Sequence, residues 1–397
     1  MLTRRGLSVL AAGALLWVAA RLTGSPDLHM VALGLLLLPA LAAVFIRWSR
    51  HGLRATRRLG QRRVFAGSPL RVAIEVQNTS RSAASLVLLE DRLPPSLGRA
   101  ARAVLGGLRG RHRQTISYTV HCGRRGRFHI GPLIASVTDP FGLAQRKEEF
   151  PDVHELIVYP HVDDLRAPSP ARTAGGAGDT TARQLYQSGE EFFTMRGYEI
   201  GDDLRRIHWP STARTGRLMI RQDEAGRRAS ATVFLDTRRA VYGADQDLER
   251  AVSAAASVGT LYLRGGIDLR LGIIDLAPQR MAPEAFLEAL ALADPSGERQ
   301  LGRSLVPLRD RSATGSALLF VTGLLADEDL GALIAATGAY GQKVAVLVVA
   351  GDGEGVRAAR VRLSRAEWRT VLLTPDRRLQ EAWTLGTARP IAAAARS

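Results

Sequence analysis

Two long apolar runs open the chain. Neither Gly6–Ala20 nor Leu28–Ile46 contains Asp, Glu, Lys or Arg. A helix needs about 20 apolar residues to cross a bilayer, so the second run predicts a spanning helix. The first run is shorter and spans if its flanking arginines reach the interface. We expect the spans at about residues 6–22 and 28–47, within a membrane hairpin of residues 1–50.

Arginines flank this hairpin unevenly. Arg4 and Arg5 precede it, and the connecting segment carries only Arg21. Seven arginines follow the second run: Arg47, Arg50, Arg54, Arg57, Arg58, Arg62 and Arg63. Because basic residues favour the cytoplasmic side, we expect a multi-pass protein of the inner (plasma) membrane whose large C-terminal part is cytoplasmic. The alternative is a cleaved signal peptide at residues 1–20, which leaves the second run as the anchor.

Short alternating runs follow in residues 60–162. Leu70–Val76 alternates, and so does Thr115–Val120, which puts Ile116, Tyr118 and Val120 on one face. Turn residues separate further apolar runs: Leu86–Leu89, Phe128–Ile130, Leu133–Val137 and Leu156–Tyr159. Several short strands at this spacing predict an all-β, antiparallel sandwich of immunoglobulin-like type. Residues 163–187 are rich in Gly and Pro, lack apolar periodicity and are expected to be a flexible linker.

The pattern changes again in residues 228–397. Continuous apolar runs predict strands at Ala231–Leu235, Ile267–Ile274, Ala317–Val321, Val344–Val349 and Val371–Leu373. Helical periodicity lies between and after them, at Asp247–Leu263, Pro283–Leu292, Asp327–Thr337 and Asp376–Leu385. This alternation predicts an α/β region with a parallel, doubly wound (Rossmann-like) sheet covered on both faces.

Composition narrows the function classes. The chain carries 54 Lys+Arg against 38 Asp+Glu, for a net charge of +16, and nearly all the basic residues are arginines. This charge favours anionic partners, including acidic lipids, but no recognition motif accompanies it, so no specific nucleic-acid binding is expected. The single Cys122 excludes an intramolecular disulfide and multi-cysteine metal sites, and we expect it to be a buried structural residue. No phosphate loop, nucleophile elbow or metalloprotease motif is present.

Residues 188–227 hold the most distinctive pattern. Its notable positions are Glu191, Phe192, Arg196, Tyr198, Gly201, Asp202, Arg205, Ile207, Trp209, Ala213 and Arg214. With Arg125-Gly126, Gly131-Pro132, Asp139–Leu143 and Tyr159-Pro160, this pattern resembles the family called domain of unknown function 58. The resemblance implies a bacterial membrane protein with a hairpin, a β domain and a cytoplasmic α/β domain of von Willebrand factor type A-like fold.

The resemblance also implies a function without catalysis. Members are often encoded beside MoxR-type AAA ATPases and transglutaminase-like membrane proteins. We therefore expect a membrane-anchored adaptor or scaffold with no enzymatic activity, no cofactor, and as partners the lipid bilayer and such a protein. The alternative is a metal-assisted hydrolase that uses Asp202, Asp203 and His208, since a carboxylate pair beside an imidazole suffices for that chemistry.

Type A folds often hold a divalent cation, through Asp-x-Ser-x-Ser and a later Thr and Asp. Here the first motif reads Asp236-Thr-Arg238-Arg-Ala240, and a later strand ends at Thr322. Both serines are missing and a guanidinium can satisfy Asp236, so the site is degenerate and no metal is expected.

The motif in residues 188–227 interleaves acidic and basic side chains. We expect these to form an internal lattice of Arg–carboxylate pairs, with Phe192 and Trp209 packed beneath it. Direct contact with a partner is the alternative for this motif. The lone His208 is expected to be a hydrogen-bonded structural residue.

Overall fold

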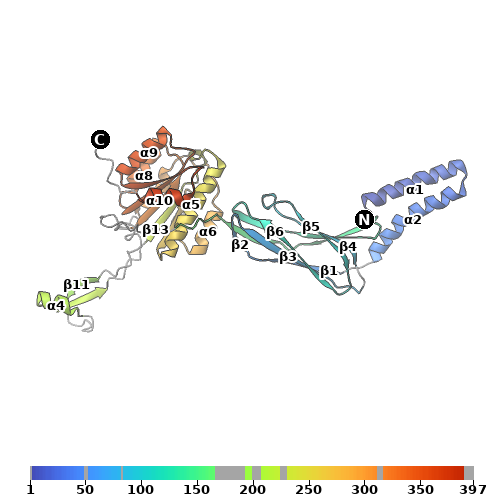
Figure 1. Ribbon diagram of the computed structural model, residues 1–397, viewed down its shortest axis with the longest axis horizontal. Helices are drawn as coiled ribbons and strands as arrows, with labels where there is room; N and C mark the ends of the chain where they lie inside the picture. Colours follow the sequence, from blue (N-terminus) through green and yellow to red (C-terminus); the bar gives the residue numbers. More distant parts are fainter. Residues whose placement is uncertain are drawn as a thin grey trace. The chain divides into compact units, whose positions relative to one another are not determined.

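The structure is a computed structural model of the chain (Figure 1). It describes residues 2–48, 52–81, 84–165, 193–198, 207–223, 230–310 and 316–388. The chain divides into two compact units, Met1–Tyr159 and Pro160–Ser397. Two apolar helices and a β-rich region make up the first unit, and the second contains an α/β region, as the hydrophobic pattern predicts.

The first unit begins with helices α1 (Arg4–Thr23) and α2 (Pro26–Trp48). The Thr3 hydroxyl oxygen caps α1 by accepting a hydrogen bond from the Gly6 amide at 3.1 Å. Gly24 ends α1 in the left-handed conformation, with φ of 69°. Both helices are long and apolar enough to cross a membrane, with mean hydropathies of 1.6 and 2.4. They coincide with the two predicted spans.

The β region contains ten described strands, several of which the alternating pattern predicted. The bounds are β1 Leu53–Leu59, β2 Arg63–Phe65, β3 Pro69–Asn78, β4 Ala84–Asp91, β5 Ala101–Leu108, β6 Arg113–His121, β7 Gly126–Ile130, β8 Leu133–Thr138, β9 Gln145–Phe150 and β10 His154–Tyr159. A short 3-10 helix, η1, covers Pro95–Leu97. The β region was expected to start at residue 60, but its first strand starts at Leu53. In this strand Leu53, Ala55 and Arg57 face inward and alternate with exposed residues, the pattern of a strand with one buried face.

These strands form three sheets, ordered β1-β3-β6, β2-β10-β7 and β5-β4-β8-β9. The inward face of β3 supplies Leu70 and Val72 to the core shared with β2, β7 and β10. The same face supplies Ile74 and Val76 to the core shared with β4, β5 and β8. One sheet therefore packs against both of the others. The pairing of β2 with β10 is parallel, which an all-antiparallel sandwich did not predict.

A buried ion pair crosses this β region. The Arg57 guanidinium donates to Asp91 at 2.9 and 2.5 Å, and to the Ile130 and Asp152 carbonyls. The Tyr118 hydroxyl donates to Asp91 at 2.6 Å, and burial together with this bond raises the pKa of Tyr118. Arg57 is thus a core residue rather than part of the basic flank of the hairpin.

The α/β region has six described strands: β13 Ser230–Leu235, β14 Asp268–Ile273, β15 Leu276–Arg280, β16 Ala317–Thr322, β17 Gln342–Val348 and β18 Trp368–Leu373. Its helices are α5 Asp245–Arg264, α6 Pro283–Ala291, α7 Gly302–Asp310, α8 Asp327–Ala336, α9 Glu354–Arg365 and α10 Leu379–Ala388. The sheet order is β15-β14-β13-β16-β17-β18. Five strands are parallel, and the edge strand β15 is antiparallel, so the expectation of a wholly parallel sheet is wrong at that edge.

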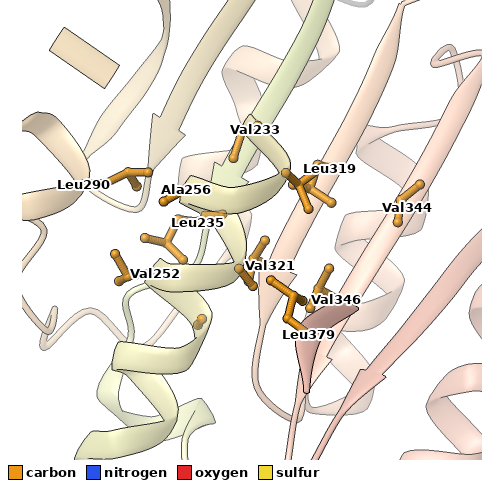
Figure 2. Packing of buried hydrophobic residues seen from close by; sticks show 14 of the residues in the cluster. Val233, Leu235, Val252, Ala256, Leu290, Leu319, Val321, Val344, Val346 and Leu379 are labelled. Carbon is orange, nitrogen blue, oxygen red and sulfur yellow. The ribbon is translucent and has the colours of Figure 1, made fainter. Parts of the chain in front are cut away.

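Helices cover both faces of this sheet, as predicted. Residues of α5, α6 and α10 share one core with Leu235 and Val321. Figure 2 shows part of this core, where Val252 and Ala256 of α5 lie near Leu235 of β13. Residues of α7, α8 and α9 share the core of the other face with Phe234 and Phe320. Neighbouring residues of one strand therefore serve opposite cores, which explains the continuous apolar runs in the sequence.

The second unit starts with a packed segment. Leu165 is buried in the core beside α5, and the Asp163 amide donates to the Ser257 hydroxyl at 2.9 Å. The Ser253 hydroxyl donates to the His161 carbonyl at 2.6 Å. Residues 163–165 are thus fixed on α5, where a flexible linker was expected. The rest of the expected linker, 166–187, lies outside the described residues.

Candidate functional site

Within residues 188–227, the structure describes residues 193–198 and 207–223, which form a strand pair and a helix. Strand β11 (Phe193–Gly197) pairs antiparallel with β12 (Met219–Asp223), and α4 (Trp209–Thr215) precedes β12 (Figure 1). The Tyr198 amide donates to the Leu218 carbonyl, and the His208 amide to the Met219 carbonyl, both at 2.9 Å. The Met219 amide donates to the Thr212 hydroxyl at 3.0 Å, which ties α4 to β12.

His208 is the N-cap of α4. Its Nδ1 accepts from the Ser211 amide at 3.3 Å and lies 2.9 Å from the Ser211 hydroxyl. A nitrogen that accepts from an amide N–H carries no proton, so the ring proton is on Nε2. His208 is thus hydrogen-bonded, as expected, and that it has no catalytic role stays a prediction. Asp202 and Asp203, its partners in the hydrolase alternative, lie outside the described residues.

The other motif residues divide into three groups. Tyr198 and Ile207 are half-buried, whereas Trp209, Ala213 and Arg214 of α4 are exposed. Arg196 lies on β11, opposite Ile220 of β12. Outside the described residues lie Glu191, Phe192, Gly201, Asp202 and Arg205.

Trp209 corrects one expectation. Its side chain is 66% exposed, and α4 has no buried residue. The predicted packing of Trp209 beneath a lattice of ion pairs is therefore wrong. Trp209 is the first residue of this seven-residue helix, and within the part of the chain that the structure describes its indole is exposed.

A second candidate site lies where the order of strands reverses between β13 and β16. In open α/β sheets the carboxyl ends of strands at such a switch point form the usual ligand crevice. Asp236 directly follows β13, and Thr322 ends β16. Both are fully buried, and the Thr322 hydroxyl donates to Asp236 Oδ2 at 2.9 Å.

Arg238 fills this crevice. Its Nε donates to Asp236 Oδ1 at 3.0 Å and its Nη2 to Oδ2 at 2.9 Å, a two-pronged ion pair. Its Nη1 donates to Asp329 Oδ2 at 2.7 Å and to the Arg299 carbonyl at 3.0 Å. Arg238 is only 1% exposed, although it bears a full charge. The guanidinium pairing expected for Asp236 is confirmed.

The electrostatics follow from this geometry. Burial lowers the pKa of Arg238, but its hydrogen bonds with Asp236 and Asp329 outweigh that effect and raise the pKa. Burial, with the nearby charge of Asp236, raises the pKa of Tyr242, whose hydroxyl donates to the Asp236 carbonyl at 2.5 Å. The guanidinium thus supplies the positive charge that balances the buried Asp236 carboxylate.

Metal chemistry has little support at this position. Asp236 Oδ1 also accepts from the Arg238 amide at 3.1 Å, so both carboxylate oxygens are already bonded. Ala240, in the short 3-10 helix η3 (Arg239–Val241), has no side-chain oxygen to offer. Within the described residues, no group of three His, Cys, Asp or Glu side chains is placed to hold a metal ion. That the chain binds no metal stays a prediction.

Sequence reasoning missed Asp329 as a member of this cluster. The signal available was the acidic first turn of α8, Asp327-Glu-Asp329, soon after a predicted strand. Acidic residues are common in first turns, so that signal alone did not distinguish Asp329. Cys122, by contrast, is fully buried as expected, and burial raises the pKa of its thiol.

Known proteins resemble parts of this chain. The uncharacterized protein YeaD of Bacillus subtilis is 23% identical over 241 residues, which span 59% of this chain and 58% of that relative. The CARDB domain of PF1109 from Pyrococcus furiosus aligns with a TM-score of 0.21 and 11% identity, over 27% of this chain and 93% of that one. A β-glucosidase from Listeria innocua aligns with a TM-score of 0.20 and 13% identity, over 28% of this chain and 16% of that enzyme. At these TM-scores neither likeness informs fold or function.

The sequence match is more informative. Residues 194–383 match the family described as protein of unknown function DUF58. That range contains most of the described motif and the whole switch point. Through residues 194–383, the chain is therefore similar to the DUF58 family, as the sequence motif predicted.

Proposed function

We propose that this protein is a non-catalytic, membrane-anchored adaptor whose α/β unit docks a protein partner in the cytoplasm. The observation that carries the proposal is the Arg238 guanidinium in the crevice between β13 and β16. A substrate or metal ion at the usual position in such a sheet would have to displace a buried, fully bonded charge. This favours binding of a partner on an outer surface over chemistry inside the crevice.

A type A-like α/β region and an immunoglobulin-like β region are part of this proposal. Asp236, Thr322 and Asp329 gather the oxygen-bearing residue types with which a type A domain holds a cation. The sheet β1-β3-β6, packed against the other two sheets, supports a sandwich.

Membrane anchoring is supported by α1 and α2. At 1.5 Å per residue, the 20 residues of α1 extend about 30 Å, the thickness of the hydrocarbon core. Most of both apolar windows is not buried within the protein, since the buried shares are only 17% and 22%. Arg4, Arg5 and Arg47 against the single Arg21 favour a cytoplasmic C-terminal part.

The docking surface we propose is the exposed side of α4, with Trp209 and Arg214. Tryptophan and arginine are the residue types most enriched among energetically dominant interface residues, and both are exposed here. From the family resemblance, the partner we propose is a MoxR-type AAA ATPase, with a transglutaminase-like membrane protein as a further partner.

Affinity capture tests this function. The tagged full-length protein is isolated from its own gently solubilised membranes, with and without ATP, and partners are quantified by mass spectrometry. We expect to recover an AAA ATPase whose yield depends on nucleotide. In Trp209→Ala we expect that yield to fall at least tenfold, which corresponds to a loss of about 1.4 kcal/mol of binding free energy. Val361→Ala, which truncates a residue 51% exposed on α9, is the matched control and is expected to retain the partner. Equal capture by both variants would reject docking through α4.

A further inference from the structure

The turn between β8 and β9, residues 139–143, is held rigidly. The buried Asp139 carboxylate accepts from the Phe141 amide at 2.9 Å and from the Ala144 amide at 2.5 Å. Gly142 has a φ of +72°, a conformation that favours glycine. These constraints turn the Phe141 side chain outward, where it is 67% exposed.

The same turn is bonded to the start of α1. The Thr3 amide donates to the Leu143 carbonyl at 2.8 Å, and the Thr3 hydroxyl donates to the Gly142 carbonyl at 2.6 Å. A Cβ atom on Gly6 would lie 2.2 Å from the Leu143 carbonyl oxygen, so only glycine permits this approach. Leu143 also shares a core with Ala42 and Ile46, near the end of α2. The turn therefore lies against the base of both apolar helices (Figure 1).

This attachment fixes the depth of the turn in a membrane. If α1 crosses the hydrocarbon core over its full length of about 30 Å, its first turn lies at the boundary between headgroups and acyl chains. The Leu143 carbonyl contacts the helix between Thr3 and Gly6, so residues 139–143 lie at that boundary. Trp and Tyr are enriched there, and Trp, Phe and Leu form the inserted face of segments that lie in the interface.

The charges around the turn fit an anionic surface. Basic side chains at the start of α1, the end of α2 and the start of β9 are exposed: Arg4, Arg5, Arg47, Arg146 and Lys147. Basic residues near an anionic leaflet are attracted to its negative surface potential.

From these contacts we infer that the 139–143 turn is a membrane-contacting surface. Phe141 inserts between the headgroups of the lipids around α1, and the neighbouring basic residues bind anionic headgroups. The β region is thereby held at a defined angle to the bilayer instead of swinging on the residues that follow α2. The inference rests on the proposed membrane anchoring.

An environment-sensitive fluorophore tests the inference. Full-length protein with Phe141→Cys in a Cys122→Ala background is labelled with a nitrobenzoxadiazole thiol reagent and reconstituted in vesicles of phosphatidylcholine and phosphatidylglycerol. We expect blue-shifted emission that is quenched by lipids bearing a nitroxide near the headgroup. The control label is at Val153→Cys, which is 50% exposed and follows the far end of β9, a six-residue strand that extends about 17 Å from the turn.

The outcomes separate this inference from the function on which it rests. One outcome is that the label at position 141 emits as in water, like the label at 153, while the protein stays with the vesicles in an alkaline wash. That outcome would overturn the inference and leave the membrane anchoring intact. Release of the protein by the wash would overturn both. Quenching at 141 that disappears when phosphatidylglycerol is omitted would still support insertion and would assign its strength to the basic residues.

Discussion

Arg238 is the residue on which the interpretation of the α/β unit depends. Its side chain bridges Asp236 and Asp329 in a position that water hardly reaches. Removing one partner of a buried ion pair leaves an uncompensated charge, which costs about 3–5 kcal/mol. We therefore expect Arg238→Met to lower the free energy of unfolding of the α/β unit by about that amount. Urea pulse proteolysis of the full-length protein in detergent, with peptides of residues 230–388 quantified, measures the loss.

The neighbouring Arg239 supplies the control. Its side chain is 71% exposed and its ion pair with Asp245 is on the surface, where such pairs contribute little. Arg239→Met is expected to unfold at the urea concentration of the parent protein. Equal midpoints for the Arg238 and Arg239 variants would mean that the Arg238 ion pair does not stabilise the fold.

Removing the guanidinium should also expose oxygen ligands. In Arg238→Ser the carboxylates of Asp236 and Asp329 and the hydroxyls of Thr322 and the new serine face the vacated space. Such a set suits a hard divalent cation, so we expect this variant to bind Mn²⁺ while the parent does not. Electron paramagnetic resonance of free Mn²⁺ measures the difference. If the parent protein bound Mn²⁺ stoichiometrically and Asp236→Ala abolished that binding, the Arg238 guanidinium would not be what occupies this position.

His154 gives the β region a pH dependence. Its Nδ1 accepts from Arg57 at 3.2 Å, and burial together with the Arg57 charge lowers the pKa of His154. The unfolded chain, with an ordinary pKa of about 6.5, then binds the proton more readily than the folded chain. Stability from this group is therefore complete above about pH 6.5 and decreases as the pH falls below it.

His154→Asn tests that pH dependence. The amide oxygen of Asn accepts from Arg57 as Nδ1 does, but does not titrate. We expect the thermal midpoint of the parent to fall between about pH 7.5 and about pH 5.5 by more than that of the variant. A variant whose midpoint shifts as much as that of the parent would assign the pH dependence to other groups.

At the scale of elements, α4 depends on its cap. Losing an N-cap costs about 1 kcal/mol, so His208→Ala is expected to lower hydrogen-exchange protection at Thr212 and the following amides about fivefold. Asp is an efficient N-cap, and His208→Asp should restore the protection. Because the role is structural, His208→Asp should also retain the partner in affinity capture. Loss of capture despite restored protection would assign the imidazole a direct role.

The elements differed in how well the sequence predicted them. Each continuous apolar run of the α/β region became a strand, because strands covered on both faces contain almost only apolar residues. The edge strand β15 (Leu276–Arg280) escaped prediction, since only Pro278 is buried and no alternation marks it. Helix α9 escaped because arginines interrupt its apolar stripe of Val356, Ala359 and Leu363.

At the scale of the whole molecule, hydrophobic periodicity predicted the order of the regions along the chain. It did not predict the buried clusters of charged side chains. Arg238 bonds Asp329 across 91 positions of sequence, and Arg57 bonds Asp91 from a strand that resembled a basic membrane flank. Such pairings depend on sheet order and register, which local patterns do not specify. The exposure of Trp209 likewise depends on which other parts of the chain pack against α4, and hydrophobic periodicity does not specify such packing.

Photo-crosslinking in living cells tests whether α4 docks a protein partner. A benzophenone amino acid replaces Trp209 in the full-length protein, and a second strain carries it at Val361 as the control. If α4 docks the partner, position 209 crosslinks to one reproducible protein, an AAA ATPase, and position 361 does not. Crosslinks from 209 only to lipid or to this same chain, together with hydrolytic activity of the purified protein that Asp202→Asn abolishes, would contradict the adaptor function.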